Sequence, residues 1–80
     1  MNSVTVVGIE FRSYVNKRTN TEVSGYNIFC TYERKGVSGV ATESFWISPD
    51  VLAELGTLQL GDKITPMYNR FGRVVSLRFA

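Results

Sequence analysis

Residues 48–56, SPDVLAELG, carry the sequence signal that decides the fold assignment. Ser48 is a suitable N-cap, Pro49 suits the first helical position, and the aspartate that follows complements the positive end of a helix. Gly56 or Gly61 can end the helix, because glycine readily adopts the left-handed conformation found at helix termini. The stretch therefore predicts one short helix, and its place among the strands selects between small β folds.

Around this helix, five segments have the composition of β-strands, with β-branched and aromatic residues separated by clusters of turn residues. They lie at about 3–14, 23–33, 39–47, 63–68 and 73–79. Gly8, inside the first segment, predicts a bulge or a sharp coil that lets one strand serve two faces of a barrel. The polar segment 16–21 is expected to project as a loop or wing, since it is too long for a tight hairpin. Residues 69–72 are expected to turn the last hairpin.

The predicted order is β-β-β-α-β-β. A helix between the third and fourth strands is the arrangement of the OB-fold, whereas the short helical turn of SH3-like barrels comes later, before the last strand. We therefore expect an all-β protein, a five-stranded OB-fold barrel with one short helix between strands three and four. No linker or repeat interrupts the sequence, so residues 1–80 are expected to form a single nucleic-acid-binding domain.

Composition narrows the classes of function. The 80 residues contain one cysteine and no histidine, which excludes an internal disulfide and the usual zinc clusters. Without histidine as a general base, and without a recognisable catalytic or phosphate-binding motif, we expect no enzyme activity, cofactor, metal or small-molecule substrate. Cys30 is expected to be a small buried hydrophobe. So small a chain needs further stabilisation, which favours a homodimer.

No apolar run is long enough to span a bilayer, and the first residues do not have the composition of a signal peptide. We therefore expect no membrane association and a location in the bacterial cytoplasm.

Charge is distributed unevenly along the chain, although the net charge is only +2. Residues 36–62 contain acidic side chains and no basic one, whereas residues 63–80 contain basic side chains and no acidic one. If the basic ends of the chain lie together, they form a positive face opposite an acidic one. The predicted helix carries acidic residues and no basic one, so it would repel a duplex rather than read its groove.

The chain contains ten aromatic residues, more than a small barrel accommodates inside. Tyr14, beside Arg12 and the basic wing, and Phe71, beside Arg70, are expected at the surface. Tyr26 and Tyr32 share one face of their predicted strand with Ile28 and Cys30, so they either extend the binding surface or pack in the core. Phe45 and Trp46 point to opposite faces and are left out of the predicted site. Aromatic rings interleaved with cations suit single-stranded nucleic acid, whose unstacked bases and phosphates need both.

The order and spacing of these residues resemble the single-stranded DNA-binding proteins of filamentous phages, the gene V protein family, or related small OB-fold proteins of phages and mobile elements. RSYVNK at 12–17 resembles the base of the family's DNA-binding wing, and Cys30 with Tyr32 resembles a cysteine and a nearby DNA-stacking tyrosine. RFG at 70–72 resembles the tip of its dyad loop, and Arg78 follows at the offset of a DNA-contacting arginine. The wing is longer here, and the helix is better capped.

The resemblance implies a dimeric OB-fold, phosphate contacts for Arg12 and Lys17, and a base contact for Tyr26. It also implies that Phe71 reaches the DNA site of the other subunit. We therefore expect a sequence-tolerant single-stranded DNA-binding protein that coats and protects strands during phage or mobile-element replication. The predicted nucleic-acid-binding residues are Arg12, Tyr14, Lys17, Arg18, Tyr26, Tyr32, Arg70, Phe71 and Arg78. A protein-interaction barrel and an RNA-binding translational regulator remain the alternatives.

Overall fold

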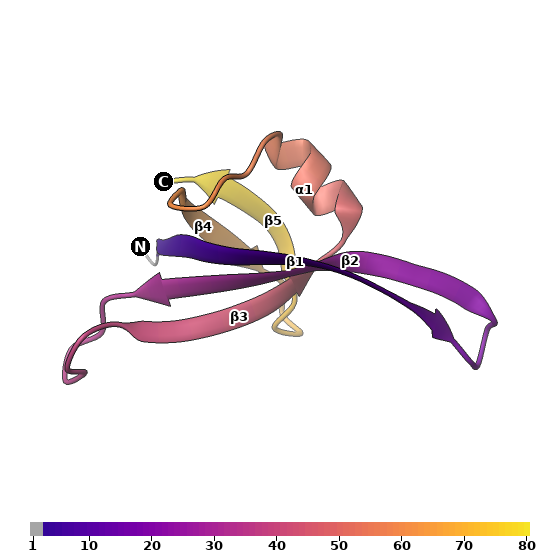
Figure 1. The fold of residues 1–80 in the computed structure, drawn as a ribbon, viewed down its shortest axis with the longest axis horizontal. Coiled ribbons are helices and arrows are strands. Elements are labelled where there is room, and N and C mark those ends of the chain that lie inside the picture. The colour runs from indigo at the N-terminus through magenta and orange to yellow at the C-terminus, as the bar shows by residue number, and fades with distance from the viewer. Residues whose placement is uncertain (1–2) are drawn as a thin grey trace.

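The computed structural model describes residues 3–80 and contains five strands and one helix (Figure 1). The elements follow the order expected from the sequence, with the helix between the third and fourth strands. They are β1 (Val4–Asn16), β2 (Thr21–Tyr32), β3 (Ala41–Ile47), α1 (Pro49–Leu55), β4 (Lys63–Tyr68) and β5 (Val74–Phe79).

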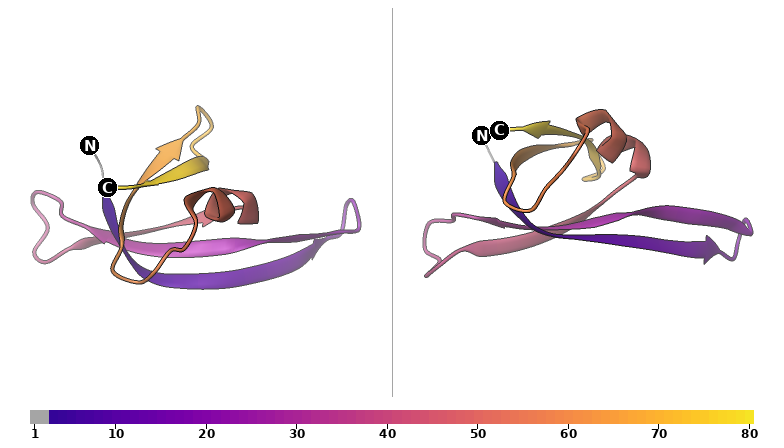
Figure 2. Two further views of the ribbon diagram at one scale, coloured as in Figure 1. Left: turned by 90° about the horizontal axis from the view of Figure 1, so that it is seen from above. Right: turned by 45° about the horizontal axis from the view of Figure 1, so that its top comes forward.

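All five strands belong to one antiparallel sheet with the order β3-β2-β1-β4-β5. The mostly β architecture is thus confirmed. The closed barrel is not confirmed, because no ladder joins β3 to β5 in the part of the chain that the structure describes. The sheet bends so that α1 packs over it against β5 and β2, as Figure 2 shows from two further directions. The two edge strands, β3 and β5, also contact each other.

The bulge expected at Gly8 is present, because the register between β1 and β2 shifts between Val6 and Gly8. Before this point β1 is shared between two partners: Thr5 lies opposite Thr31 of β2 and also opposite Lys63 of β4. After it, β1 pairs only with β2. One bulge therefore lets a single strand join the long β1–β2 hairpin to the β4–β5 hairpin.

The wing differs from the expected loop. β1 and β2 stay paired as far as Asn16 and Thr21, so the wing is a long regular hairpin closed by a four-residue turn (Figure 1). The prediction that this segment is too long for a tight hairpin is wrong. Asn20 takes a positive φ of 54°, which asparagine tolerates well, and its N–H donates to the Asn16 carbonyl oxygen at 2.7 Å. The Asn16 Oδ1 accepts from the Arg18 N–H at 3.0 Å and fixes the turn further.

The core lies between the inner face of the sheet and α1. Its buried members are all apolar or thiol side chains: Val4, Val6, Ile28, Cys30, Ile47, Val51, Ile64, Val74 and Leu77. Cys30 is 1% exposed, as expected for a small buried hydrophobe. Burial, and then the nearby Glu43 carboxylate, raise the pKa of its thiol from 9.0 to about 11. The thiol is therefore protonated, and a poor nucleophile, near neutral pH.

The helix begins at Pro49 and ends at Leu55, with Gly56 in a positive-φ conformation after it. Ser48 precedes the helix in an extended conformation, but its side chain makes no capping hydrogen bond. Its carbonyl oxygen instead accepts from the N–H groups of Val51 and Leu52. Among residues 3–80, no helix has both the length and the apolar character needed to cross a membrane.

Candidate nucleic-acid interface

The register of β1, β2 and β3 sorts their side chains onto two faces. Residues directly opposite each other in an antiparallel pair share a face. Phe11, Tyr26 and Ile47 lie opposite one another on the inner face, which covers the core. The other face, here called the outer face, carries Arg12, Tyr14, Phe29 and Trp46. The alternation predicted for β2 is therefore correct, and the outer face presents large side chains to solvent.

An aromatic pair forms the centre of the outer face. The rings of Tyr14 and Trp46 lie 6.4 Å apart between centroids, in a tilted arrangement. Their exposed fractions are 57% and 37%. The indole of Trp46 lies over Gly25, where a side chain would collide with it: a Cβ at Gly25 would stand 2.6 Å from the Trp46 Cε2. The absence of a side chain at Gly25 thus allows the indole to lie against the strand while one part stays in water.

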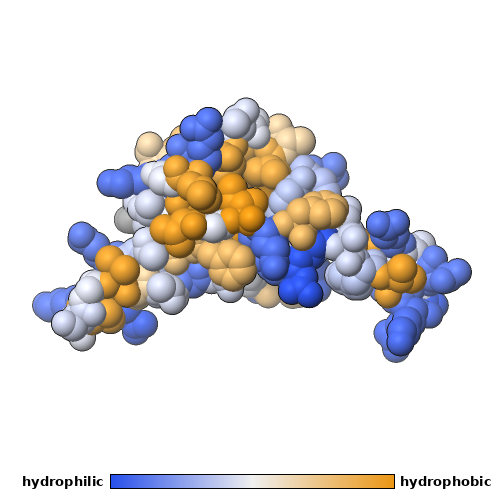
Figure 3. Space-filling model, in the orientation of Figure 1, coloured by the Kyte–Doolittle hydropathy of each residue, from blue (hydrophilic) through white to orange (hydrophobic). Residues whose placement is uncertain are grey.

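Cations flank this aromatic pair. Arg12 projects from the outer face two residues before Tyr14 and forms an ion pair with Glu10, at 3.7 Å between Nη1 and Oε1. Both side chains are well exposed, so the pair contributes little and leaves the guanidinium free to bind another anion. Lys17 and Arg18 lie exposed at the turn of the wing. Figure 3 shows hydrophilic residues gathered at the wing end of the molecule and hydrophobic ones over its body.

The tip of the β4–β5 hairpin has a defined shape. The Asn69 Oδ1 accepts from the N–H of Phe71 at 2.9 Å and from the N–H of Arg73 at 3.0 Å. Gly72 has a φ of 78°, which a residue with a side chain rarely adopts. The ring of Phe71 is 74% exposed and is covered on one side by the Arg70 guanidinium, 5.1 Å from its centroid. The tip therefore presents a ring and a cation to solvent, as the sequence predicted.

A groove of about 870 Å³ connects this tip with the outer face. It runs along the gap between the unpaired edges of β3 and β5. Tyr14 and Trp46 line one side, and Asn69, Gly72 and Arg73 line another. Its remaining lining residues are Val23, Ser44, Phe45, Ser48, Val74 and Val75. The base of the wing and the last hairpin thus meet at one groove within a single chain, whereas the turn of the wing projects elsewhere (Figure 2, left).

The predicted site residues divide into several groups. Arg12 and Tyr14 share the outer face, Lys17 and Arg18 lie farther out on the wing, and Arg70 and Phe71 form the hairpin tip. Arg78 is exposed, but it pairs with Thr65 at the end of the hairpin remote from that tip. None of these groups is buried.

Tyr26 and Tyr32 lie on the inner face, half-buried against the core, so the structure does not bring them to the outer face. The edge of the Phe11 ring packs against Tyr26, with centroids 5.4 Å apart. Tyr32 instead lines a second cavity, near the start of β1. A role for either tyrosine in binding stays a prediction and would need a ligand that reaches the inner side of the sheet.

Of the groove's lining residues, only Tyr14 belongs to the predicted site; the aromatic and basic side chains missed from sequence include Trp46 and Arg73. The alternation within β3 shows only that Phe45 and Trp46 face opposite ways. The pairing of Trp46 with Asn27 of β2 is what assigns Trp46 to the outer face. Arg73 is one of the basic residues of segment 63–80, but its place beside the groove depends on the bend of the hairpin.

Comparisons with protein-family models, with curated proteins and with solved structures found no match to this chain.

Proposed function

We propose that this chain is a non-enzymatic, sequence-tolerant single-stranded DNA-binding protein. It would coat and protect unpaired strands during phage or mobile-element replication in a bacterial cytoplasm, acting as a homodimer. In this proposal the strand lies in the groove between β3 and β5. Bases stack on Tyr14 and Trp46, while Arg12 and Arg73 contact phosphates.

The observation that carries the proposal is the exposed aromatic pair in a groove that Arg73 also lines, with Arg12 on the same face of the sheet as Tyr14. Tyr14 and Trp46 contribute nothing to the buried core, yet both present ring surface to water. A base that stacks on such a ring contributes about 1–3 kcal/mol, with little dependence on its identity. Arginines beside the rings supply the charge that a phosphate chain requires.

The topology also supports the proposal. The helix between β3 and β4, the strand β1 shared between two hairpins, and the adjacent edges of β3 and β5 fit a partly open OB-fold. OB-folds bind oligonucleotides on the face and loops of their barrel. The exposed Phe71 and the unpaired edge of β5 offer surfaces through which a second subunit could complete the site.

Fluorescence anisotropy with labelled oligo-dT at low and high salt tests the function. We expect binding that weakens as salt rises, because phosphate contacts release counterions. Tyr14→Ala should weaken binding by about 1–3 kcal/mol, whereas Tyr14→Phe, which keeps the ring, should bind like the parent. Circular dichroism should show the same fold for both variants.

Three outcomes are decisive. No binding at any salt would refute the proposal and favour a protein-interaction module. Equal affinity of Tyr14→Ala and the parent would remove the outer face from the binding site. Stronger binding of an oligo-U competitor than of oligo-dT would make RNA the ligand.

A further inference from the structure

A second cavity lies at the other end of β3, on the inner side of the sheet. Its volume is about 520 Å³, within the range of about 300–1,000 Å³ typical of small-molecule sites. The start of β1, the end of β2, and parts of β3 and β4 form its walls. It is lined by Ser3, Val4, Tyr32, Glu33, Arg34, Lys35, Glu43, Pro66 and Tyr68.

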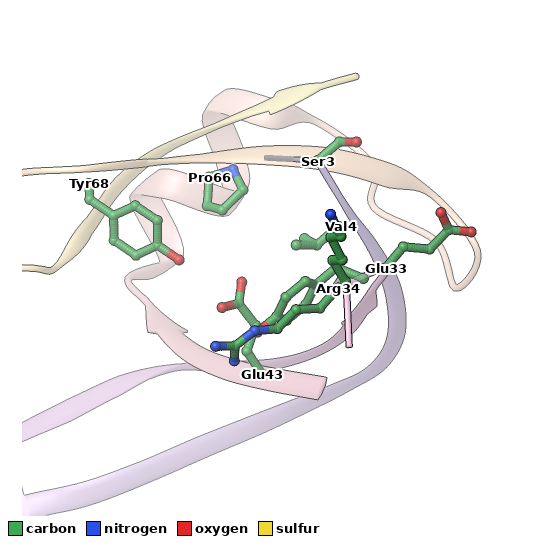
Figure 4. Close-up of a pocket in the computed structure, with 9 residues that line it drawn as sticks. Ser3, Val4, Glu33, Arg34, Glu43, Pro66 and Tyr68 are labelled. Carbon is green, nitrogen blue, oxygen red and sulfur yellow. The ribbon is translucent and has the colours of Figure 1, made fainter. Parts of the chain in front are cut away.

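Glu43, Tyr68 and Arg34 present polar groups at this cavity, and the Arg34 guanidinium extends toward the side of the Glu43 carboxylate (Figure 4). The Glu43 carboxylate projects from β3 and the Tyr68 hydroxyl from β4, toward the same space, while Glu33 extends away from it. The Glu43 carboxylate makes no hydrogen bond or ion pair with any other residue in the described range 3–80. Burial, and then Glu43, raise the pKa of the Tyr68 phenol, so its hydroxyl remains a donor near neutral pH.

The cavity is adjacent to the groove of the proposed binding site. Glu43 lines the cavity and the next residue, Ser44, lines the groove. In the same way Tyr68 lines the cavity and Asn69 lines the groove. A strand held in the groove can therefore pass around the edge of β3 and place one base in the cavity. Arg34 and Lys35, which also line the cavity, supply the positive charge to contact the phosphates on either side of that base.

We propose that this cavity is a base-reading pocket selective for guanine, an inference that rests on the proposed function. An ionised carboxylate only accepts hydrogen bonds, and it repels phosphate. It therefore suits a base that offers donors. Guanine alone presents two adjacent donors, N1–H and the N2 amino group, which match the two oxygens of Glu43. Its O6 acceptor lies beside them, in position to receive the Tyr68 hydroxyl.

The other bases fit less well. Adenine and cytosine offer one amino group beside an acceptor nitrogen, and thymine offers one N–H between two carbonyl oxygens. Each of these edges places an acceptor against the carboxylate or leaves one of its oxygens without a partner. A good bidentate contact discriminates between bases by about tenfold or more. One position of the bound strand is thus read, while stacking elsewhere remains tolerant of sequence.

The test uses oligo-dT with one central deoxyguanosine, deoxyinosine or deoxyadenosine. Deoxyinosine keeps N1–H and O6 but lacks the amino group, so affinity should fall in the order guanine, inosine, adenine. The guanine oligonucleotide should bind about tenfold more tightly than the adenine one. Glu43→Gln should abolish this preference, because the amide offers only one acceptor oxygen. Glu33→Gln, which removes the same charge at the same end of the molecule, should retain the preference.

The outcomes separate the two proposals. If plain oligo-dT binds but the three oligonucleotides bind equally, the guanine pocket is refuted and the proposed function stands. The same holds if Glu43→Gln keeps the preference, or if Glu33→Gln loses it. If no oligonucleotide binds, the proposed function itself fails.

Discussion

Replacing Gly25 with alanine should destabilise the protein strongly, although it adds a single methyl group. A Cβ at this position would lie 2.6 Å from the Trp46 Cε2 and 2.6 Å from the carbonyl oxygen of Ile47. Unbonded carbon atoms normally stay about 3.5–4.0 Å apart, so both neighbours would have to move by about 1 Å. The indole can rotate outward into water. The Ile47 carbonyl cannot move freely, because Ile47 pairs with Tyr26 in the ladder between β2 and β3.

The magnitude follows from these two displacements. Forcing an extra methyl group into a packed site costs about 1–3 kcal/mol, and a weakened ladder hydrogen bond adds about 0.5–1.5 kcal/mol. The free energy of unfolding should therefore fall by about 2–4 kcal/mol. At about 0.05–0.15 kcal/mol per residue, that is a large share of the stability of so small a domain.

Urea unfolding followed by fluorescence measures the change, because Trp46 is the only tryptophan and reports directly on the site. Gly8→Ala is the matched control. Its Cβ would meet only the side chain of Phe29, at 3.2 Å, which can shift slightly, so it should cost less than about 1 kcal/mol. If Gly25→Ala keeps the parent's midpoint and emission spectrum, the packing described for Trp46 is wrong.

Two further predictions concern the core and the hairpin tip. Because the folded state raises the pKa of Cys30 to about 11, the contribution of this thiol to the free energy of unfolding should be fully present below pH 9.0 and fall by about 2–3 kcal/mol as the pH rises toward 11. Urea midpoints across this range should show the fall, and its persistence unchanged in Cys30→Ala would assign it to other groups. Asn69→Ala should lose about 1–2 kcal/mol and weaken oligo-dT binding, because its Oδ1 holds the N–H groups of Phe71 and Arg73. Asn69→Asp keeps the acceptor and should retain the parent's stability, although its added charge repels phosphate and should weaken oligo-dT binding; an equal loss of stability in both variants would contradict this role.

Much of the fold could be read from local sequence. The helix begins at Pro49 and ends before Gly56, and β4 occupies the predicted residues, because proline, glycine and β-branched residues constrain the backbone where they stand. The bulge near Gly8 was predictable for the same reason. The turn of the wing was mispredicted, because its compactness depends on one asparagine in a left-handed conformation and another that binds the backbone.

The candidate site was less predictable, because it depends on register and on the bend of the sheet. Alternation showed that Phe45 and Trp46 face opposite ways, but only the pairing of β3 with β2 assigns Trp46 to the outer face. The same information places Tyr26 on the inner face, away from Tyr14. The position of Glu43 in a cavity could not be predicted from the sequence, because a lone glutamate in a strand does not indicate which cavity its side chain lines.

The sharing of β1 between two hairpins has a consequence for the order of folding. The β1–β2 and β4–β5 hairpins each join residues close in sequence, whereas Val4 meets Ile64 only after most of the chain has been brought back on itself. Closing so large a loop loses entropy before the few bonds at this junction compensate for it. The two hairpins can form early and independently. The junction around Val4 and Val6, where Val6 exchanges hydrogen bonds with Gly61 and Asp62, is then the slow, late step that fixes their relative positions.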